Sequence, residues 1–138
     1  MTRPIDITLH QGPLPPAARW LVAGAGAVVR FEGVVRPTEH GRALAALHYE
    51  AYEPMTTQQL HGLARSIVAE HSLLGVRVAH SIGDVAVGEV SFRLDVAAAH
   101  RVEALSAMAA FIDRLKQQVP LWKVPRFADE PAGLEAQT

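Results

Sequence analysis

Two lysines near the C-terminal end of the chain, Lys116 and Lys123, are suited to chemistry on an anionic or electrophilic group. Lys116 follows Ile112 by four residues at the edge of a predicted helix's apolar stripe, and Lys123 follows Pro120-Leu-Trp122, where the proline ends that helix. A lysine desolvated beside another cation has a lowered pKa and acts as a base or a nucleophile. The alternative is structural: the Lys116 stem covers core while its ammonium reaches water, and the helix dipole favours both charges.

His100 and Arg101 form a second candidate site, where a predicted strand passes into a predicted helix. Backbone N–H groups at a helix N-terminus favour an anion, and an arginine adds a bidentate donor for phosphate. Arg36, with Arg42, borders a loop after another predicted strand, and its alternative role is an edge-strand charge that limits aggregation. Because the formal net charge of the chain is only −1, any anion site must be a local cluster of this kind.

The distance between these cations along the predicted helix leads to a prediction about the oligomeric state. If the helix begins near Arg101, Lys116 lies 15 residues further on, which is about 22 Å along the helix axis. His100, Arg101 and Lys116 of one chain therefore cannot easily contact one small substrate. Either they serve separate sites or a second copy of the chain supplies one of the groups, and we predict a homodimer with a shared site.

Composition excludes several classes of function. The chain has 138 residues, enough for one domain with its own core, and its charge balance provides no global field for nucleic acid or an anionic membrane. It has no cysteine, which excludes disulfides, thiolate metal sites and a persulfide carrier. The seven histidines lack paired metal spacing and no nucleotide-binding glycine motif occurs, so we expect no metal and no cofactor. The N-terminus lacks the apolar segment of a secretory signal, so we expect a cytoplasmic protein.

The elements that must position these residues follow from the hydrophobic periodicity. Two helices are predicted, one beginning at 54–57 and one near Arg101, because their apolar residues recur at helical spacing. Alternating apolar residues predict strands in the rest of the chain, including a hairpin of 27–35 with 43–52. The order predicts an α+β domain with a mainly antiparallel sheet over residues 1–127, followed by a polar tail at 128–138.

Taken in order, the motifs of the chain resemble those of the catalytic (large) subunit of molybdopterin synthase. The resemblance runs from about Gly26 to Lys123, most of the chain. The motifs that carry it are Phe31-Glu-Gly33-Val-Val-Arg36, Leu47-His-Tyr49-Glu50-Ala-Tyr52 with Met55, His80-Ser-Ile-Gly83, Gly88-Glu89, His100-Arg101, Lys116 and Pro120-Leu-Trp122-Lys123. Each motif is weak alone, and the ordered series is specific.

The resemblance implies an α/β-hammerhead fold, a homodimer, and a small ubiquitin-like sulfur-carrier subunit docked at each end to give a heterotetramer. It implies a sulfurtransferase of molybdenum cofactor biosynthesis. The C-terminal Gly-Gly thiocarboxylate of the partner would donate sulfur to cyclic pyranopterin monophosphate, forming the dithiolene of molybdopterin. By position, Lys116 and Lys123 would be the catalytic pair. The substrate-binding residues would be Arg36, His100, Arg101, Phe31, Val34, Val35, Val124 and Pro125.

The residues themselves agree with this function. A sulfur-transfer subunit without cysteine must receive its sulfur on another molecule, and an anionic thiocarboxylate with a pterin phosphate calls for local cations. One alternative is a non-catalytic paralogue that binds a ubiquitin-like tail without turnover, and another is a generic phosphate-binding domain. Retention of both Lys116 and Lys123 favours the enzyme, because a scaffold has no chemical need for them.

Overall fold

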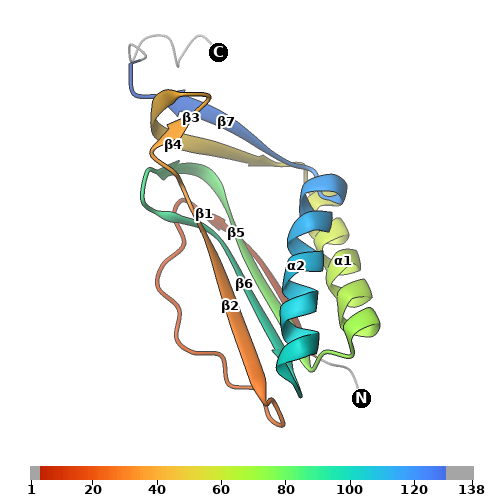
Figure 1. The fold of residues 1–138 in the computed structure, drawn as a ribbon. Coiled ribbons are helices and arrows are strands. Elements are labelled where there is room, and N and C mark those ends of the chain that lie inside the picture. The colour runs from red at the N-terminus through yellow and green to blue at the C-terminus, as the bar shows by residue number, and fades with distance from the viewer. Residues whose placement is uncertain (1–3, 130–138) are drawn as a thin grey trace.

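A computed structural model describes residues 4–129 of the chain. Within these residues, strands from distant parts of the sequence form one sheet, and two helices pack beside each other on one of its faces (Figure 1). The elements, in chain order, are β1 (Ile5–Gln11), β2 (Ala27–Val34), β3 (Thr38–Glu39), β4 (Arg42–Ala51), α1 (Met55–His71), β5 (Gly75–Ala86), β6 (Val90–Ala98), α2 (Arg101–Gln118) and β7 (Leu121–Phe127).

The sheet has the strand order β2-β6-β5-β4-β3, with β1 paired to β5 and β7 paired to β4. The β1–β5 pair is parallel, and the other pairs within the described residues are antiparallel. The predicted α+β class, with a mainly antiparallel sheet and two main helices, is therefore confirmed.

The main core lies between the helices and one face of the sheet. Leu60 and Ile67 of α1 and Phe111 of α2 are fully buried against Val78 and Leu94 of the two central strands. Alternate residues of each strand point to one face of a sheet, so the apolar set of β5 and β6 faces the helices. Burial of such apolar side chains is the main source of the stability that holds the helices in place.

A side-chain bridge connects the start of α1 with the turn between α2 and β7. Thr56 is fully buried; its Oγ1 accepts a hydrogen bond from the backbone N–H of Tyr52 at 2.8 Å and donates one to the carbonyl oxygen of Pro120 at 2.7 Å. Pro120 ends α2, because proline cannot continue a helix without loss of a backbone donor. The bridge thus fixes the point from which β7 leaves α2.

The predicted hairpin of 27–35 with 43–52 is wrong. β2 pairs with β6 instead, and β4 pairs with β3, β5 and β7. The chain leaves β2 at Val35, whose backbone N–H donates to the carbonyl oxygen of Glu89, and β4 instead forms a short hairpin with β3 through His40 and Gly41. Both turn residues have positive φ, 54° and 73°, as a two-residue hairpin loop requires.

Two features of the described residues bear on the remaining predictions. Neither helix is long and apolar enough to cross a membrane. Ala128 and Asp129 follow β7, and the rest of the predicted polar tail, residues 130–138, lies outside the described residues, as do residues 1–3.

Candidate functional site

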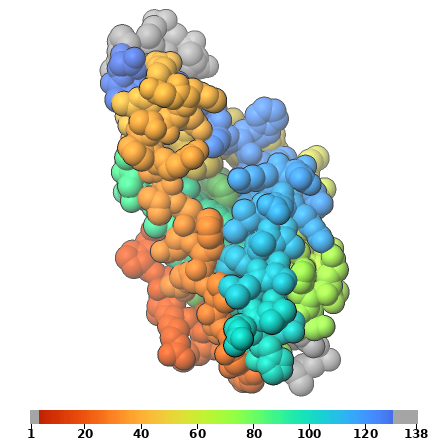
Figure 2. Space-filling view, viewed as in Figure 1, coloured from red at the N-terminus to blue at the C-terminus, as the bar shows by residue number. Residues whose placement is uncertain are grey.

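A cavity of about 580 Å³ opens between the β3–β4 hairpin, β2, β7 and the C-terminal half of α2. The hairpin and the C-terminal end of α2 lie at the same end of the molecule, and the surfaces of β2 and α2 run side by side (Figure 2). Cavities of this volume are in the range that holds small-molecule ligands. The cavity is therefore the candidate site for the chemistry predicted from the sequence.

The chain has two lysines, Lys116 and Lys123, and both line this cavity. Lys116 shares one face of α2 with Ile112, Leu115 and Val119, which also line the cavity, because residues three, four and seven apart fall on one side of a helix. Lys123 pairs with Tyr49 across the β4–β7 ladder, so the two side chains project from the same face of the sheet. The predicted convergence of the lysines on one cavity is thus present in one chain.

The two lysines differ in their partners. Lys123 Nζ donates a hydrogen bond to Glu39 Oε1 at 3.2 Å, and the two form an ion pair. Lys116 has no hydrogen-bond or ion-pair partner among the described residues. One ammonium group is therefore held in place by the protein, while the other is available to a ligand.

Arg36 adds a third cation, just beyond the end of β2, and it too lacks an ion-pair partner within the described part of the chain. Phe31 and Phe92 provide apolar lining beside it, with their ring centroids 6.0 Å apart. With the lysines and Glu39, the cavity holds three cations and one carboxylate, a net formal charge of +2. Such a cavity favours an anionic ligand with a flat or apolar part.

His80 also lines the cavity, although the sequence placed it only among surface or core histidines. It is buried, its Nδ1 lies 2.8 Å from the carbonyl oxygen of Ser81, and its ring packs edge-on against Tyr49 at 5.1 Å. Burial lowers the pKa of His80, and the hydrogen bond to Ser81 opposes this in part. A neutral imidazole that donates from Nδ1 presents Nε2 as an acceptor.

Glu39 and Tyr49 are further cavity residues that sequence reasoning did not select. Tyr49 Oη donates a hydrogen bond to Ser91 Oγ at 3.0 Å, which fixes the phenol ring beside His80. The alternation of Val76, Val78 and His80 along a predicted strand was a usable signal for His80, because it puts that side chain on the helix-facing side of the sheet. No comparable local signal existed for Glu39.

Five of the eight predicted substrate-binding residues lie outside the cavity of one chain, and three of them, Val35, Val124 and Pro125, lie beside residues that line it. Val35 is buried in the smaller apolar cluster with Leu44 and Val85; Leu44 lines the cavity, but Val35 does not. Val124 follows Lys123 on β7, and successive side chains of a strand point to opposite faces, so the two cannot both face the cavity. Pro125 pairs with Leu47, which lines the cavity, but Pro125 itself does not line it. By contrast, the predicted contacts Phe31 and Val34 do line it.

His100 and Arg101 are exposed at the opposite end of α2 from Lys116. α2 begins at Arg101, so the separation along the helix is the predicted one, about 22 Å. His100 occupies the extended N-cap position without capping the helix through its side chain. In one chain these two residues do not contribute to the cavity, and they remain free for another role.

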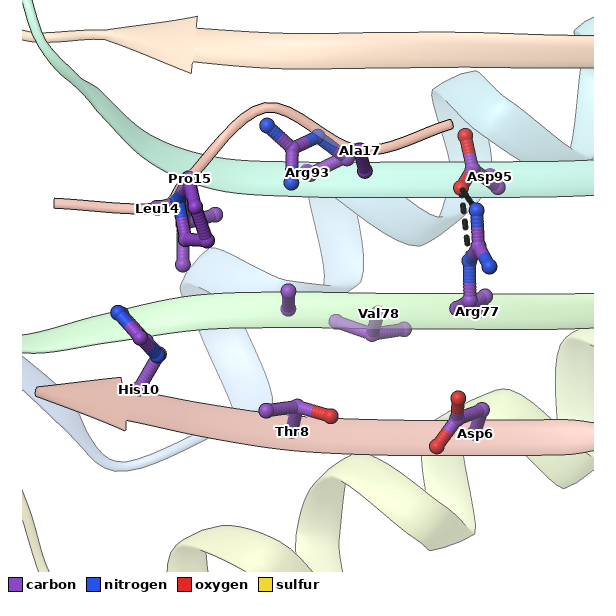
Figure 3. A pocket seen from close by; sticks show the side chains of 11 residues that line it. Asp6, Thr8, His10, Leu14, Pro15, Ala17, Arg77, Val78, Arg93 and Asp95 are labelled. Atoms are coloured by element: carbon purple, nitrogen blue, oxygen red, sulfur yellow. Dashed lines mark hydrogen bonds and ion pairs between the residues drawn. The ribbon is translucent and has the colours of Figure 1, made fainter. Parts of the chain in front are cut away.

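A second, smaller cavity of about 220 Å³ lies on the other face of the sheet, beneath the segment that carries Leu14, Pro15 and Ala17 (Figure 3). Its two arginines are already paired: Arg77 with Asp95 at 2.9 Å, and Arg93 with Glu32 at 2.7 Å. The described residues hold no cluster of side chains suited to a metal ion, here or in the larger cavity. The smaller cavity therefore has no unpaired arginine to offer an anionic ligand, and the larger one is the candidate site.

Comparison with known proteins gives consistent matches. The family model described as MoaE protein matches residues 9–118. The molybdopterin synthase catalytic subunit of Coccidioides immitis (strain RS) is 39% identical over 132 residues, which are 94% of this chain and 66% of that protein. The crystal structure of molybdopterin synthase from Staphylococcus aureus has a TM-score of 0.76 and 27% identity, covering 91% of this chain and 92% of that chain.

A chain in the protein–protein complex of subunits 1 and 2 of molybdopterin-converting factor from Helicobacter pylori 26695 has a TM-score of 0.68. It is 23% identical and covers 90% of each chain, which shows a shared fold. The present chain spans about half to two thirds of the length of several curated relatives that it matches, between 54% and 66%.

Proposed function

The chain belongs to the MoaE protein family, and from this we propose that it is the catalytic subunit of a molybdopterin synthase. The proposed reaction moves sulfur from the C-terminal thiocarboxylate of a small ubiquitin-like subunit to cyclic pyranopterin monophosphate. Two such transfers give the dithiolene of molybdopterin, so two donor tails are consumed for each product. The proposal makes the protein a sulfurtransferase of molybdenum cofactor biosynthesis.

The observation that carries the proposal is the meeting of both lysines and Arg36 in one cavity of about 580 Å³. A thiocarboxylate and a phosphate are both anions, and charge-assisted hydrogen bonds to Lys and Arg are the strong contacts available to them. The apolar rings of Phe31 and Phe92 supply a surface for the flat pterin. The cavity thus offers cations for the substrate phosphate and the donor thiocarboxylate, and aromatic rings for the pterin.

The absence of cysteine from the sequence supports the proposed source of the sulfur. A protein without a thiol cannot carry sulfur as a persulfide, so the atom must arrive on a second molecule. A C-terminal tail is thin enough to enter a cavity, where a bulkier donor domain would remain outside. The position of the lysines on the lining suits contact with the end of such a tail.

We assign Lys123 to activation of the thiocarboxylate carbonyl, or transient bonding to it, and Lys116 to acid–base transfer and charge stabilisation. Arg36 binds the substrate phosphate or pterin, with Phe31 and Val34 in contact with the ligand. The contacts predicted for Val35, Val124 and Pro125 stay predictions, since these side chains lie outside the cavity of one chain.

The proposal includes a homodimer in which His100 and Arg101 of one protomer complete the site of its partner. Their distance from Lys116 along α2 supports this arrangement, because the same chain cannot bring both ends of the helix to one substrate. A sulfur-carrier subunit at each end of the dimer would give a heterotetramer, and a cytoplasmic location is part of the same proposal.

The direct test is conversion of cyclic pyranopterin monophosphate by this protein mixed with a thiocarboxylated ubiquitin-like subunit. We expect dithiolene product, detected by mass spectrometry, and none when the subunit ends in an ordinary carboxylate. Binding of the subunit is measured in parallel. Binding without product would contradict the enzyme and favour the non-catalytic interaction module.

A further inference from the structure

Glu39 is the one carboxylate among the described residues that line the cavity, and it is paired with one of the proposed catalytic lysines. Its side chain is 14% exposed, whereas that of Lys123 is 51% exposed. The carboxylate is therefore held against the cavity wall, while the ammonium group remains accessible from solvent. A ligand that enters the cavity meets Lys123 with Glu39 already in place.

The hairpin makes the position of Glu39 well defined. Glu39 pairs with Arg42 across a two-residue turn, and the Arg42 guanidinium stacks over the Phe127 ring of β7 at 3.7 Å from its centroid. Arg42 also pairs with Asp129 at 2.9 Å. These contacts attach the hairpin to β7, the strand that carries Lys123, so the Glu39–Lys123 pair bridges two segments that are already fixed relative to each other.

A partly exposed pair of one lysine and one carboxylate is weak, because water and salt screen it. An incoming carboxylate or thiocarboxylate competes with Glu39 for the same ammonium group and is repelled by the Glu39 charge. Lys116 and Arg36 face no such competitor among the described residues. An anion that binds at Lys123 must therefore displace Glu39 and overcome its charge, whereas an anion at Lys116 or Arg36 displaces no carboxylate of the described residues.

We propose that Glu39 is an exchangeable counter-ion of Lys123, displaced by the anionic end of the incoming tail and paired again with Lys123 when the spent tail leaves. This inference rests on the proposed function and adds a positioning residue to it. The spent tail ends in a carboxylate, the same group as Glu39, so Glu39 competes with it directly. Since two tails must enter and leave for each product, faster release benefits turnover.

Binding is tested without turnover, using a synthetic peptide that ends in Gly-Gly with a free carboxylate and the same peptide with an amide end. Glu39→Gln keeps the shape and removes the charge; we expect it to tighten binding of the carboxylate peptide about three- to tenfold, by removing a like charge near the site. The amide peptide should bind both proteins equally. Equal or weaker binding of the carboxylate peptide to the variant overturns the proposal.

Two further variants separate charge from structure. Glu39→Asp keeps the charge and should stay within about twofold of the original affinity; tightening as large as that of Glu39→Gln overturns the proposal. Glu70→Gln removes a carboxylate paired with Arg114 at 2.7 Å, outside the cavity, and should leave peptide binding unchanged. An equal gain in Glu70→Gln would mean that net charge alone is responsible, which also contradicts a role specific to Glu39.

Turnover gives the second measurement. We expect Glu39→Gln to lower KM for the sulfur-carrier subunit and to lower kcat with it, because the spent tail is released more slowly. An unchanged KM with reduced kcat contradicts the exchange. If the unmodified protein shows no turnover, the proposed reaction fails, while the peptide measurement still decides whether Glu39 competes for Lys123.

Discussion

At the scale of single residues, the cavity combines cations with a buried, uncharged imidazole. His80 is enclosed by Tyr49 and Phe92, with ring centroids 5.1 and 5.7 Å away, and burial lowers its pKa below the ordinary value of 6.5. A neutral histidine beside three cations adds a hydrogen-bond acceptor without adding to the repulsion between the positive charges. This is the arrangement expected of a cavity that must bind anions and also orient a polar heterocycle.

The lowered pKa of His80 predicts a pH dependence of stability. The unfolded chain binds the proton more tightly than the folded one, so the contribution of the neutral imidazole is complete above pH 6.5 and is lost as the pH falls below it. NMR should show His80 still neutral at pH 6.5, with the proton on Nδ1. His80→Phe should reduce the fall in unfolding free energy between about pH 7 and 5.5. An imidazole that is half protonated at or above pH 6.5 contradicts the assignment.

Residue type and local spacing were enough to predict part of the site. Lys116 and Lys123 flank a helix end, and the structure brings both to one cavity with Arg36. Phe31 and Val34 also line this cavity, but they were expected only from the family resemblance. Glu39 could not be predicted, because its contact with Lys123 joins residues 84 positions apart in the sequence. The alternation along β5 indicates which face His80 points to, but its contacts with Tyr49 and Phe92 depend on packing between β4, β5 and β6, which no local pattern specifies.

At the scale of elements, periodicity predicted both helices and the mainly antiparallel sheet, since each rests on a local pattern. The pairing of β2 was predicted wrongly, because strands that are neighbours in sequence need not pair. β2 pairs with the distant β6 instead, where apolar pairs such as Val29 with Val96 alternate with charged pairs such as Arg30 with Asp95. β5 is longer than expected: its first part pairs with β1 and β6, and its last part, from Gly83 onward, pairs with β4. Gly83 therefore lies where the strand changes its partners from β1 and β6 to β4.

Glycine suits this change of partners, since the φ of Gly83 is +81°. We expect Gly83→Ala to lower the free energy of unfolding by about 1–2 kcal/mol, because an alanine in the left-handed region is strained and because its Cβ would force the Gln11 side chain to move. Gly62, inside α1, is the matched control: a Cβ there meets nothing closer than 3.9 Å. Gly62→Ala should stabilise by about 0.5–1 kcal/mol, because alanine is the better helix former. Denaturant unfolding measures both, and equal effects would contradict the account of Gly83.

At the scale of the whole molecule, the residues of the proposed site fall into two groups that are far apart within one chain. The lysines and Arg36 lie at one end of α2, and His100 and Arg101 lie at the other. A two-fold symmetric dimer would let each protomer complete the site of the other. The proposed dimer follows from this division of the groups along a rigid helix.

A shared site predicts that two inactive variants restore each other. Arg101→Ala and Lys116→Ala dimers, mixed and allowed to exchange subunits, would form hybrids in about half of the dimers, each with one intact site out of two. Activity should therefore recover to about a quarter of the original value. No recovery, with subunit exchange verified by mass spectrometry, contradicts the shared site and leaves His100 and Arg101 with a separate function.

The central claim is that the two lysines of the cavity carry out the sulfur transfer, and one assay tests it most directly. Dithiolene formation is measured for the unmodified protein, Lys116→Ala, Lys123→Ala and, as a control, Arg114→Ala, which removes a cation of α2 outside the cavity. We expect each lysine variant to lose at least about a hundredfold in kcat, while Arg114→Ala keeps nearly full activity. Lysine variants that fold, bind the sulfur-carrier subunit and still form product at the original rate would contradict the account.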